Sequence, residues 1–443
     1  MELTQLLPQF GNAAFTILAF VLALSIIVAI HEYGHYIVGR WSGIHAEVFS
    51  LGFGPVLFSR IDRRGTKWQV AALPFGGFVK FLGDANSASV GATEVPQADK
   101  RRTMLGAPLW ARALTVLAGP VFNFILSLLV FGAVIMGQGQ IADPMRIAAL
   151  QPLPPAMGQE MQVGDQIVAM NGTATPTLDS MNAIEADLPL TGLVEYTVLR
   201  AGAEVLVKGP HPYPPLVLGV APGSAAYDAG LQRDDVITAV DDQPVWSFDQ
   251  LVQMVIGGEG KAMLLSVWRG GQELTFTIVP RRADLPTPGG GFETRWLVGV
   301  SGGLVFELQT ETPGFWATAG MALNQLWSIF VGSLSGLYHI VTGAISSCNL
   351  SGPVGIAQAS GAMAAQGAVS FMWFVGVLSA AVGLMNLFPI PVLDGGHLVF
   401  FGYEALTGRK PGVRALNVLM VAGLALVLFM TFFALANDLF LCP

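Results

Sequence analysis

The stretch His31-Glu32-Tyr33-Gly34-His35 lies inside a long apolar segment, residues 13–39, and it decides how the chain is interpreted. On an α-helix, residues i and i+4 share a face, so His31 and His35 can bind one metal ion. Neutral imidazole suits Zn²⁺, and Glu32 can accept a proton from a water molecule that the metal acidifies. On a soluble helix, the same match could be two unrelated histidines. Inside an apolar segment, ionisable side chains are costly and mark a functional site, so we predict a metal site here.

The composition of the whole chain favours a membrane protein. Of the 443 residues, 53% are hydrophobic and 12% are charged, whereas soluble domains carry about 25% charged residues. A disordered chain is excluded, because disorder requires low hydrophobicity and high charge. The net charge is −8 and there is no basic block, so we expect no nucleic-acid partner. The two cysteines, Cys348 and Cys442, form neither a CxxC motif nor a disulfide framework.

Four segments are long enough to cross a lipid bilayer, which requires about 20 apolar residues. They are residues 13–39, 113–137, 371–393 and 415–437. The first is not read as a signal peptide, because residues 1–30 hold no Lys or Arg. A further apolar segment, 313–347, is expected to be an interfacial helix within a linker segment 301–370, with a fifth span as the alternative.

The basic residues indicate the orientation of the spans. Ten of the 22 Lys and Arg residues lie between Arg40 and Arg112, and three more lie at 409, 410 and 414. The positive-inside rule therefore places loops 40–112 and 404–414 in the cytoplasm. Both termini and the segment 138–370 are then expected on the other side of the membrane.

Asp394 is the natural third metal ligand. Catalytic zinc usually has three protein ligands and one open position, and Asp394 is the only charged residue in the run 371–403. The predicted topology places it in the cytoplasmic half of a span, as it does His31 and His35. Two alternatives remain open: Asp394 is the N-cap of a helix starting at Gly395, which is compatible with ligation, or His397 is the ligand instead.

The residues just before Asp394 predict a break in the third span. Pro389 and Pro391 remove backbone donors and end a helix. Non-helical backbone at membrane depth is tolerated where it is buried in protein or lines a cavity, and an active site supplies one. Asn386 in this stretch either holds the strand of a substrate or only ties down the broken helix.

These motifs resemble those of the site-2 proteases, a family of intramembrane zinc metalloproteases. His31–His35 and Leu393-Asp394-Gly395 match the two signature motifs, and Gly119-Pro120-Val121-Phe122-Asn123 matches a third. The resemblance covers essentially the whole chain, and within the family it is closest to the bacterial regulator-of-sigma-E protease type. It implies that His31, His35 and Asp394 are zinc ligands and that Glu32 is the catalytic base. It also implies that Asn386, with Pro389 and Pro391, engages the substrate and that Asn123 lies near the site.

The resemblance also implies a fold: four transmembrane helices, a membrane-associated β-hairpin and two extracytoplasmic α+β PDZ domains, in the bacterial inner membrane. The membrane domain would comprise residues 1–137, with loop 40–112, and residues 371–443. Residues 138–210 would form a degenerate first PDZ domain, and residues 211–300 a second, on the periplasmic side.

The expected hairpin occupies two β-rich segments, Ile44–Phe58 and Lys67–Val79. Gly76 and Gly77 lie in the second segment, within the apolar run LPFGGFVK. By resemblance, the edge of this hairpin binds an extended substrate by strand addition. The alternative is a small sheet with a structural role only.

An internal repeat supports the two extracytoplasmic domains. Residues 164–172 recur 70 residues later as residues 234–242, and Val198-Leu199-Arg200 recurs as Val267-Trp268-Arg269. Alternation in both copies predicts strands, and the pairs at 171–172 and 241–242 predict turns. Two copies indicate tandem modules rather than a solenoid. PDZ domains bind extended chain ends, so the modules are expected to bind peptide ends or to act as a size filter.

We therefore expect an enzyme that hydrolyses a peptide bond within or near a transmembrane segment of a single-pass substrate. The resemblance implies an anti-sigma factor, already trimmed on the periplasmic side, in an envelope stress response. Remnant signal peptides are a second implied substrate class. The alternative is a non-enzymatic zinc transporter or sensor with PDZ adaptor modules. A transporter would place further ligands along a path, whereas this sequence shows one cluster.

Overall fold

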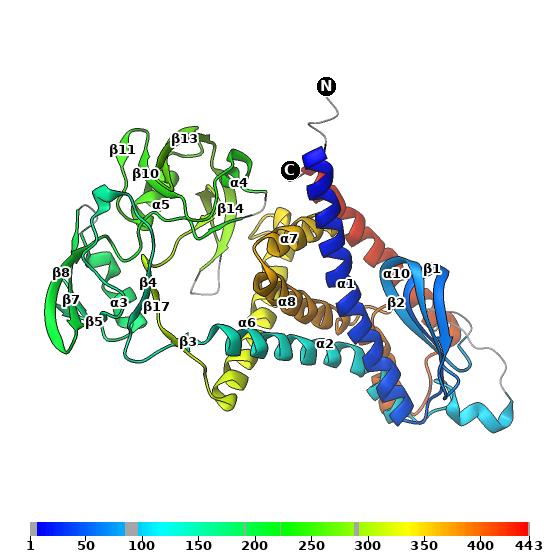
Figure 1. Ribbon diagram of the computed structural model, residues 1–443. Helices are drawn as coiled ribbons and strands as arrows, with labels where there is room; N and C mark the ends of the chain where they lie inside the picture. Colours follow the sequence, from blue (N-terminus) through cyan, green and yellow to red (C-terminus); the bar gives the residue numbers. More distant parts are fainter. Residues whose placement is uncertain (1–6, 85–95, 190–191, 222, 288–291, 442–443) are drawn as a thin grey trace. The chain divides into compact units, whose positions relative to one another are not determined.

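The structure is a computed structural model that describes residues 7–84, 96–189, 192–221, 223–287 and 292–441 (Figure 1). It divides into two compact units. Unit 1 comprises residues 1–136 and 314–443, and unit 2 comprises residues 137–313. Cys442, one of the two cysteines, and Pro222, in the expected second PDZ domain, lie outside the described residues.

Four helices in the described part of the chain are long and apolar enough to cross a membrane, as the sequence predicts. They are α1 (Leu7–Trp41), α2 (Leu109–Gln138), α8 (Ala368–Asn386) and α10 (Val413–Ala436), which a π-helical turn, Asn437–Leu441, extends. The third span is shorter than the expected 371–393, because α8 ends at Asn386, before the two prolines. The segment 313–347 folds as a helix, α6 (Phe315–Val341), which is not among these four candidate spans.

Small residues hold α2 against α8. Ser127 Oγ of α2 donates a hydrogen bond to the Gly376 carbonyl, and Ser379 Oγ of α8 donates one to the Asn123 carbonyl. A Cβ atom at Gly376 would lie 2.8 Å from Phe131, so this helix pair depends on the absence of a side chain there. Small residues and hydroxyl hydrogen bonds are the usual means by which helices associate in a bilayer.

Unit 1 also contains two short α-helices and a hairpin. The helices are α7 (Pro353–Ala365) and α9 (Asp394–Thr407). The strands β1 (Ala46–Ile61) and β2 (Lys67–Phe81) pair antiparallel in the region where the sequence predicts β-structure, and β2 packs against α1. The second half of β1 exposes apolar side chains such as Leu57, which is 71% exposed.

Unit 2 contains two four-stranded sheets with the same strand order, as the internal repeat predicts. The first is β6-β5-β7-β8 and the second is β11-β10-β12-β13. Equivalent residues are paired: Ile167 with Val198 in the first sheet, and Ile237 with Val267 in the second. The strands are β5 (Gln166–Met170), β6 (Thr173–Ala174), β7 (Val194–Arg200), β8 (Ala203–Gly209), β10 (Val236–Val240), β11 (Gln243–Pro244), β12 (Met263–Arg269) and β13 (Gln272–Ile278).

Beside each sheet, at the equivalent place, an arginine pairs with a buried aspartate. Arg200 donates two hydrogen bonds to Asp165, and Arg269 donates two to Asp235. The Asp165 and Asp235 side chains are 1% and 0% exposed, and a planar guanidinium satisfies both oxygens of each. The sequence repeat is therefore a repeat of structure and of side-chain contacts.

Unit 2 extends past residue 300, where the sequence analysis placed the start of a linker. Strands β16 (Val300–Ser301), β17 (Phe306–Leu308) and β18 (Thr310–Glu311) pair with β9 (Gly219–Val220), β4 (Ile147–Leu150) and β3 (Gln140–Ile141). The unit also contains the α-helices α3 (Leu178–Ala183), α4 (Ala225–Ala229) and α5 (Phe248–Gly257) and the strands β14 (Arg281–Pro286) and β15 (Phe292–Leu297). The last strands of unit 2, β17 and β18, thus pair with its first strands, β4 and β3.

Candidate metal centre

Three side chains from two helices converge at one point. His31 Nε2 lies 3.1 Å from His35 Nε2 and 3.2 Å from Asp394 Oδ2, and His35 Nε2 lies 3.5 Å from the same oxygen. Zn–N and Zn–O bonds of about 2.0–2.1 Å in a tetrahedral site place the ligand atoms about 3.3 Å apart. The buried Oδ2 atom accepts no hydrogen bond from the described residues. The donor set and its spacing therefore fit a zinc ion.

Helix α1 presents both histidines to α2 because two glycines allow close approach. A Cβ atom at Gly34 of α1 would lie 2.5 Å from the Ala118 carbonyl oxygen. A Cβ atom at Gly119 of α2 would lie 2.4 Å from His35 Nε2 and 2.8 Å from His31 Cε1. Any side chain at Gly119 would therefore displace the two imidazole rings.

Helix α2 also orients the imidazole rings through their other nitrogens. His35 Nδ1 lies 2.8 Å from the Thr115 carbonyl, which only accepts, so Nδ1 carries the proton and Nε2 presents its lone pair. His31 Nδ1 lies 3.2 Å from the Asn123 side-chain nitrogen, while Asn123 Oδ1 is buried without a partner. Turning this amide by 180° lets Oδ1 accept from Nδ1–H, since its two ends have nearly the same shape. Both rings then have the tautomer that metal ligation through Nε2 needs.

Asp394 is the first residue of α9, and the N-cap is Leu393, which makes no side-chain cap hydrogen bond. The reading of Asp394 as the N-cap of a helix starting at Gly395 is therefore wrong: the helix begins one residue earlier, so the carboxylate projects from its first turn. The turn 387–393 packs tightly on this end, because a Cβ atom at Gly395 would lie 2.2 Å from the Leu387 carbonyl and one at Gly396 would lie 2.3 Å from the Ile390 carbonyl.

A cavity of about 690 Å³ opens beside the three ligand atoms. Glu32, Asn386 and His397 are in its wall, together with Gly77 of β2. A Cβ atom at Gly77 would lie 3.1 Å from Glu32 Cγ, so the hairpin backbone passes close to the Glu32 side chain. Asn386 donates a hydrogen bond from Nδ2 to the Val382 carbonyl, 3.0 Å away, and thereby ties down the end of α8.

Three residues that the sequence analysis assigned to substrate binding lie elsewhere in the described structure. Pro389 and Pro391 belong to the turn 387–393, and Pro391 packs against Gly423 of α10. Gly76 has φ +146°, and a Cβ atom there would lie 2.4 Å from the Phe53 ring. None of these three is among the described residues of the cavity wall.

Sequence reasoning missed two residues of α2 near the site, Thr115 and Arg112, whereas the resemblance had already placed Asn123 there. Thr115 acts through its carbonyl, which no side-chain pattern reveals. Arg112 contributed only to the orientation argument, yet this buried residue forms an ion pair with Glu404 in the cavity wall. A usable signal was available: Arg112, Thr115, Gly119 and Asn123 follow one another at helical spacing of three or four residues on one face.

Comparison with known proteins gives consistent matches over nearly the whole chain. The model of peptidase family M50 matches residues 19–430. A protein of Rhizobium meliloti that bears the name zinc metalloprotease is 33% identical over 97% of each chain. A similarly named protein of Agrobacterium fabrum is 32% identical over 96% of this chain and 95% of its own. The regulator of sigma-E protease of Escherichia coli is 29% identical over 95% of this chain and 97% of its own.

Proposed function

The chain belongs to peptidase family M50, and from this we propose that His31, His35 and Asp394 hold the zinc ion of a membrane metalloprotease. The observation that carries the proposal is the triangle of ligand atoms, with edges of 3.1, 3.2 and 3.5 Å. These three residues form the one group in the described residues that has the spacing for a metal ion. A zinc transporter would need further ligands along a path, so the transporter or sensor alternative is not favoured.

Peptide hydrolysis at this site assigns a role to each group around the cavity. Zinc supplies Lewis acidity, which polarises a peptide carbonyl and lowers the pKa of water. Glu32 accepts the proton of the attacking water and delivers it to the leaving amine, because it follows His31 on α1 and lines the same cavity. Thr115 and Asn123 keep the ligating nitrogens unprotonated.

The substrate class is a polypeptide in extended form at the edge of the hairpin. Gly77 brings the backbone of β2 close to Glu32, so a strand that adds to this hairpin presents its peptide bonds to the cavity. A transmembrane helix must unwind before its amides can be cleaved, and strand pairing replaces the hydrogen bonds it loses. Asn386 in the cavity wall is the side chain we assign to holding that strand. Pro389 and Pro391 stiffen the turn behind it, and Gly76 supports the hairpin.

The wider role follows from the relatives and from the repeat. The regulator of sigma-E protease, one of the matched proteins, suggests regulated proteolysis of a single-pass anti-sigma factor, with remnant signal peptides as a second substrate class. The basic loops 40–112 and 404–414 support a cytoplasmic active site in the bacterial inner membrane. The two equivalent sheets of unit 2 support two PDZ domains, about 138–210 and 211–300, on the periplasmic side, with 301–370 as the return segment.

The test is cleavage of a single-pass transmembrane substrate by the purified full-length protein in detergent. Glu32→Gln should keep zinc and lose cleavage, because the carboxamide cannot accept the proton. The matched control is Glu273→Gln on the exposed face of β13, which should cleave like the parent. Asp394→Ala should lower the zinc content. Cleavage by Glu32→Gln at the parent rate, or full zinc occupancy in Asp394→Ala, would overturn these assignments.

A further inference from the structure

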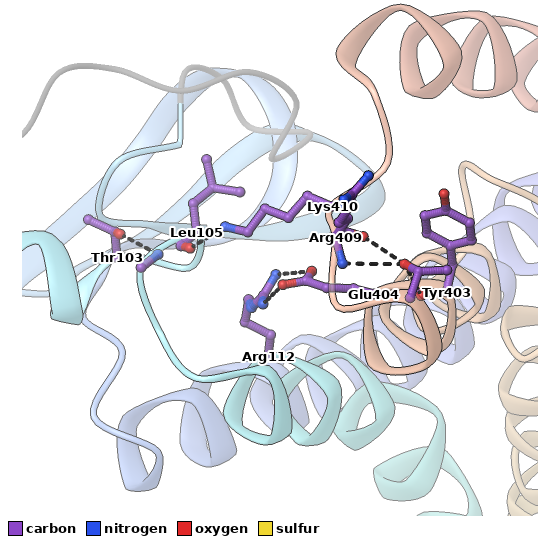
Figure 2. A network of polar contacts seen from close by, with 9 residues as sticks. Thr103, Leu105, Arg112, Tyr403, Glu404, Arg409 and Lys410 are labelled. Carbon is purple, nitrogen blue, oxygen red and sulfur yellow. Dashed lines mark hydrogen bonds and ion pairs between the residues drawn. The ribbon is translucent and has the colours of Figure 1, made fainter.

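An ion pair between a buried arginine and a partly buried glutamate lies in the wall of the cavity, away from the metal ligands. Arg112 of α2 donates hydrogen bonds of 2.6 and 3.0 Å to the two carboxylate oxygens of Glu404 of α9 (Figure 2). Their side chains are 6% and 16% exposed. The guanidinium also lies 5.2 Å from the centre of the Phe401 ring. Arg112 therefore contacts α9 at two positions on one face.

That face of α9 is the face that carries the metal ligand. Asp394, His397, Phe401 and Glu404 follow one another at intervals of three, four and three residues, and all four line the cavity. Glu404 is ten residues after Asp394, which corresponds to about 15 Å along the helix. A rotation of α9 about its axis would move the Glu404 and Asp394 carboxylates together.

One face of α2 contacts both helices that carry the metal ligands, α1 and α9. Arg112 contacts α9, whereas Thr115 and Asn123 contact the histidines of α1. The loop before α2 adds a second tie, because Lys410, just after α9, donates a hydrogen bond to the Leu105 carbonyl at 3.1 Å (Figure 2). One helix thus fixes the two histidines and the helix of the aspartate at the same time.

We propose that the Arg112–Glu404 ion pair is a positioning device for the metal site: it sets the rotation and depth of α9 so that Asp394 Oδ2 meets the two histidine nitrogens. The inference rests on the proposed zinc site. A surface ion pair would carry no such argument, since pairs in water contribute little. This pair is bidentate and its arginine is buried, so losing Glu404 leaves a buried guanidinium without compensation, and lysine cannot replace the two-pronged geometry of arginine.

The experiment measures zinc affinity of the full-length protein in detergent, by competition with a chromophoric chelator. Arg112→Lys and Glu404→Gln should each weaken zinc binding by about tenfold, in the range found when groups that orient metal ligands are replaced. The exchanged pair, Arg112→Glu with Glu404→Arg, should recover part of the loss. With cobalt in place of zinc, the visible spectrum of the saturated single variants should change, which a general loss of stability would not cause.

Two controls make the result decisive. Arg200→Lys alters the equivalent bidentate pair with Asp165 in unit 2, and it should leave zinc affinity and the cobalt spectrum unchanged. Asp394→Ala tests the site itself. If Asp394→Ala loses zinc while Arg112→Lys and Glu404→Gln bind it like the parent, the positioning role is refuted and the zinc site stands. If Asp394→Ala also binds zinc like the parent, the proposed site is refuted. A single variant that does not fold is judged by whether the exchanged pair folds and regains affinity; failure to regain it contradicts the proposal.

Discussion

Replacing Gly119 by alanine tests the contact between α2 and the two imidazole rings. The added methyl carbon would lie 2.4 Å from His35 Nε2 and 2.5 Å from His35 Cε1. Ordinary contacts between such atoms are about 3.5 Å, so the ring must retreat by about 1 Å or the helices must separate. The ligating nitrogen is the atom most affected.

The expected effect is large for a single methyl group. A displacement of about 1 Å at a reacting centre costs about 100-fold in rate, and we expect zinc affinity to fall by at least tenfold. Overpacking also lowers the free energy of unfolding by about 1–3 kcal/mol. Part of this loss is offset, because alanine is the better helix former by about 1 kcal/mol.

The assay compares Gly119→Ala with a matched variant of the same helix, Gly132→Ala. A Cβ atom at Gly132 meets only Thr318 Cγ2, at an ordinary 3.8 Å, while the gain in helix propensity is the same. Zinc affinity by chelator competition and cleavage of a single-pass substrate are measured for both. If Gly119→Ala binds zinc and cleaves like Gly132→Ala, the packing of α2 on the histidines is not as we describe it.

Three further predictions concern other contacts. Asn123→Leu removes the acceptor of His31 Nδ1 and should weaken zinc binding by about tenfold, measured by chelator competition; unchanged affinity contradicts the tautomer assignment. Hydrogen bonds from Arg200 hold the pKa of Asp165 below its usual range, so this group stabilises the fold above its unfolded pKa of about 3.9 and the stabilisation is lost as pH falls through the folded pKa. Arg200→Met should therefore lower the melting temperature most near neutral pH and least near pH 3; a constant difference between these pH values contradicts the linkage. Asp438 accepts hydrogen bonds of 2.9–3.0 Å from the amides of Gly352, Val354 and Gly355 at the start of α7, so Asp438→Ala should cost about 1–2 kcal/mol, seen as faster amide exchange in α7 and refuted by unchanged exchange.

The parts of the site that sequence can predict are those that depend on position along one helix. The spacing of His31 and His35 indicates a shared ligand face, and the isolated charge of Asp394 indicates a third ligand. The structure brings the ligand atoms of these three side chains within 3.5 Å of one another. The apolar segments and the alternating strands of the repeat likewise predict elements that the structure contains.

What the sequence could not provide is the packing between helices. The end of α8 at Asn386 and the start of α9 at Asp394 depend on how the turn 387–393 folds onto two glycines. The roles of the Thr115 carbonyl and the Arg112–Glu404 pair require knowing which faces of α1, α2 and α9 meet. Those faces are set by close contacts at Gly34 and Gly119, where one missing side chain determines the distance between two helices.

All the residues proposed for metal binding and proton transfer belong to unit 1, although unit 2 separates them in the chain. Unit 2 is topologically an insertion: the chain enters it after Met136 and leaves it before Gly314, through strands β3 and β18, which pair with each other. Such an insertion can be exchanged, lengthened or lost by recombination without altering one catalytic residue. The metal site and the inserted unit can therefore evolve as separate modules of one gene.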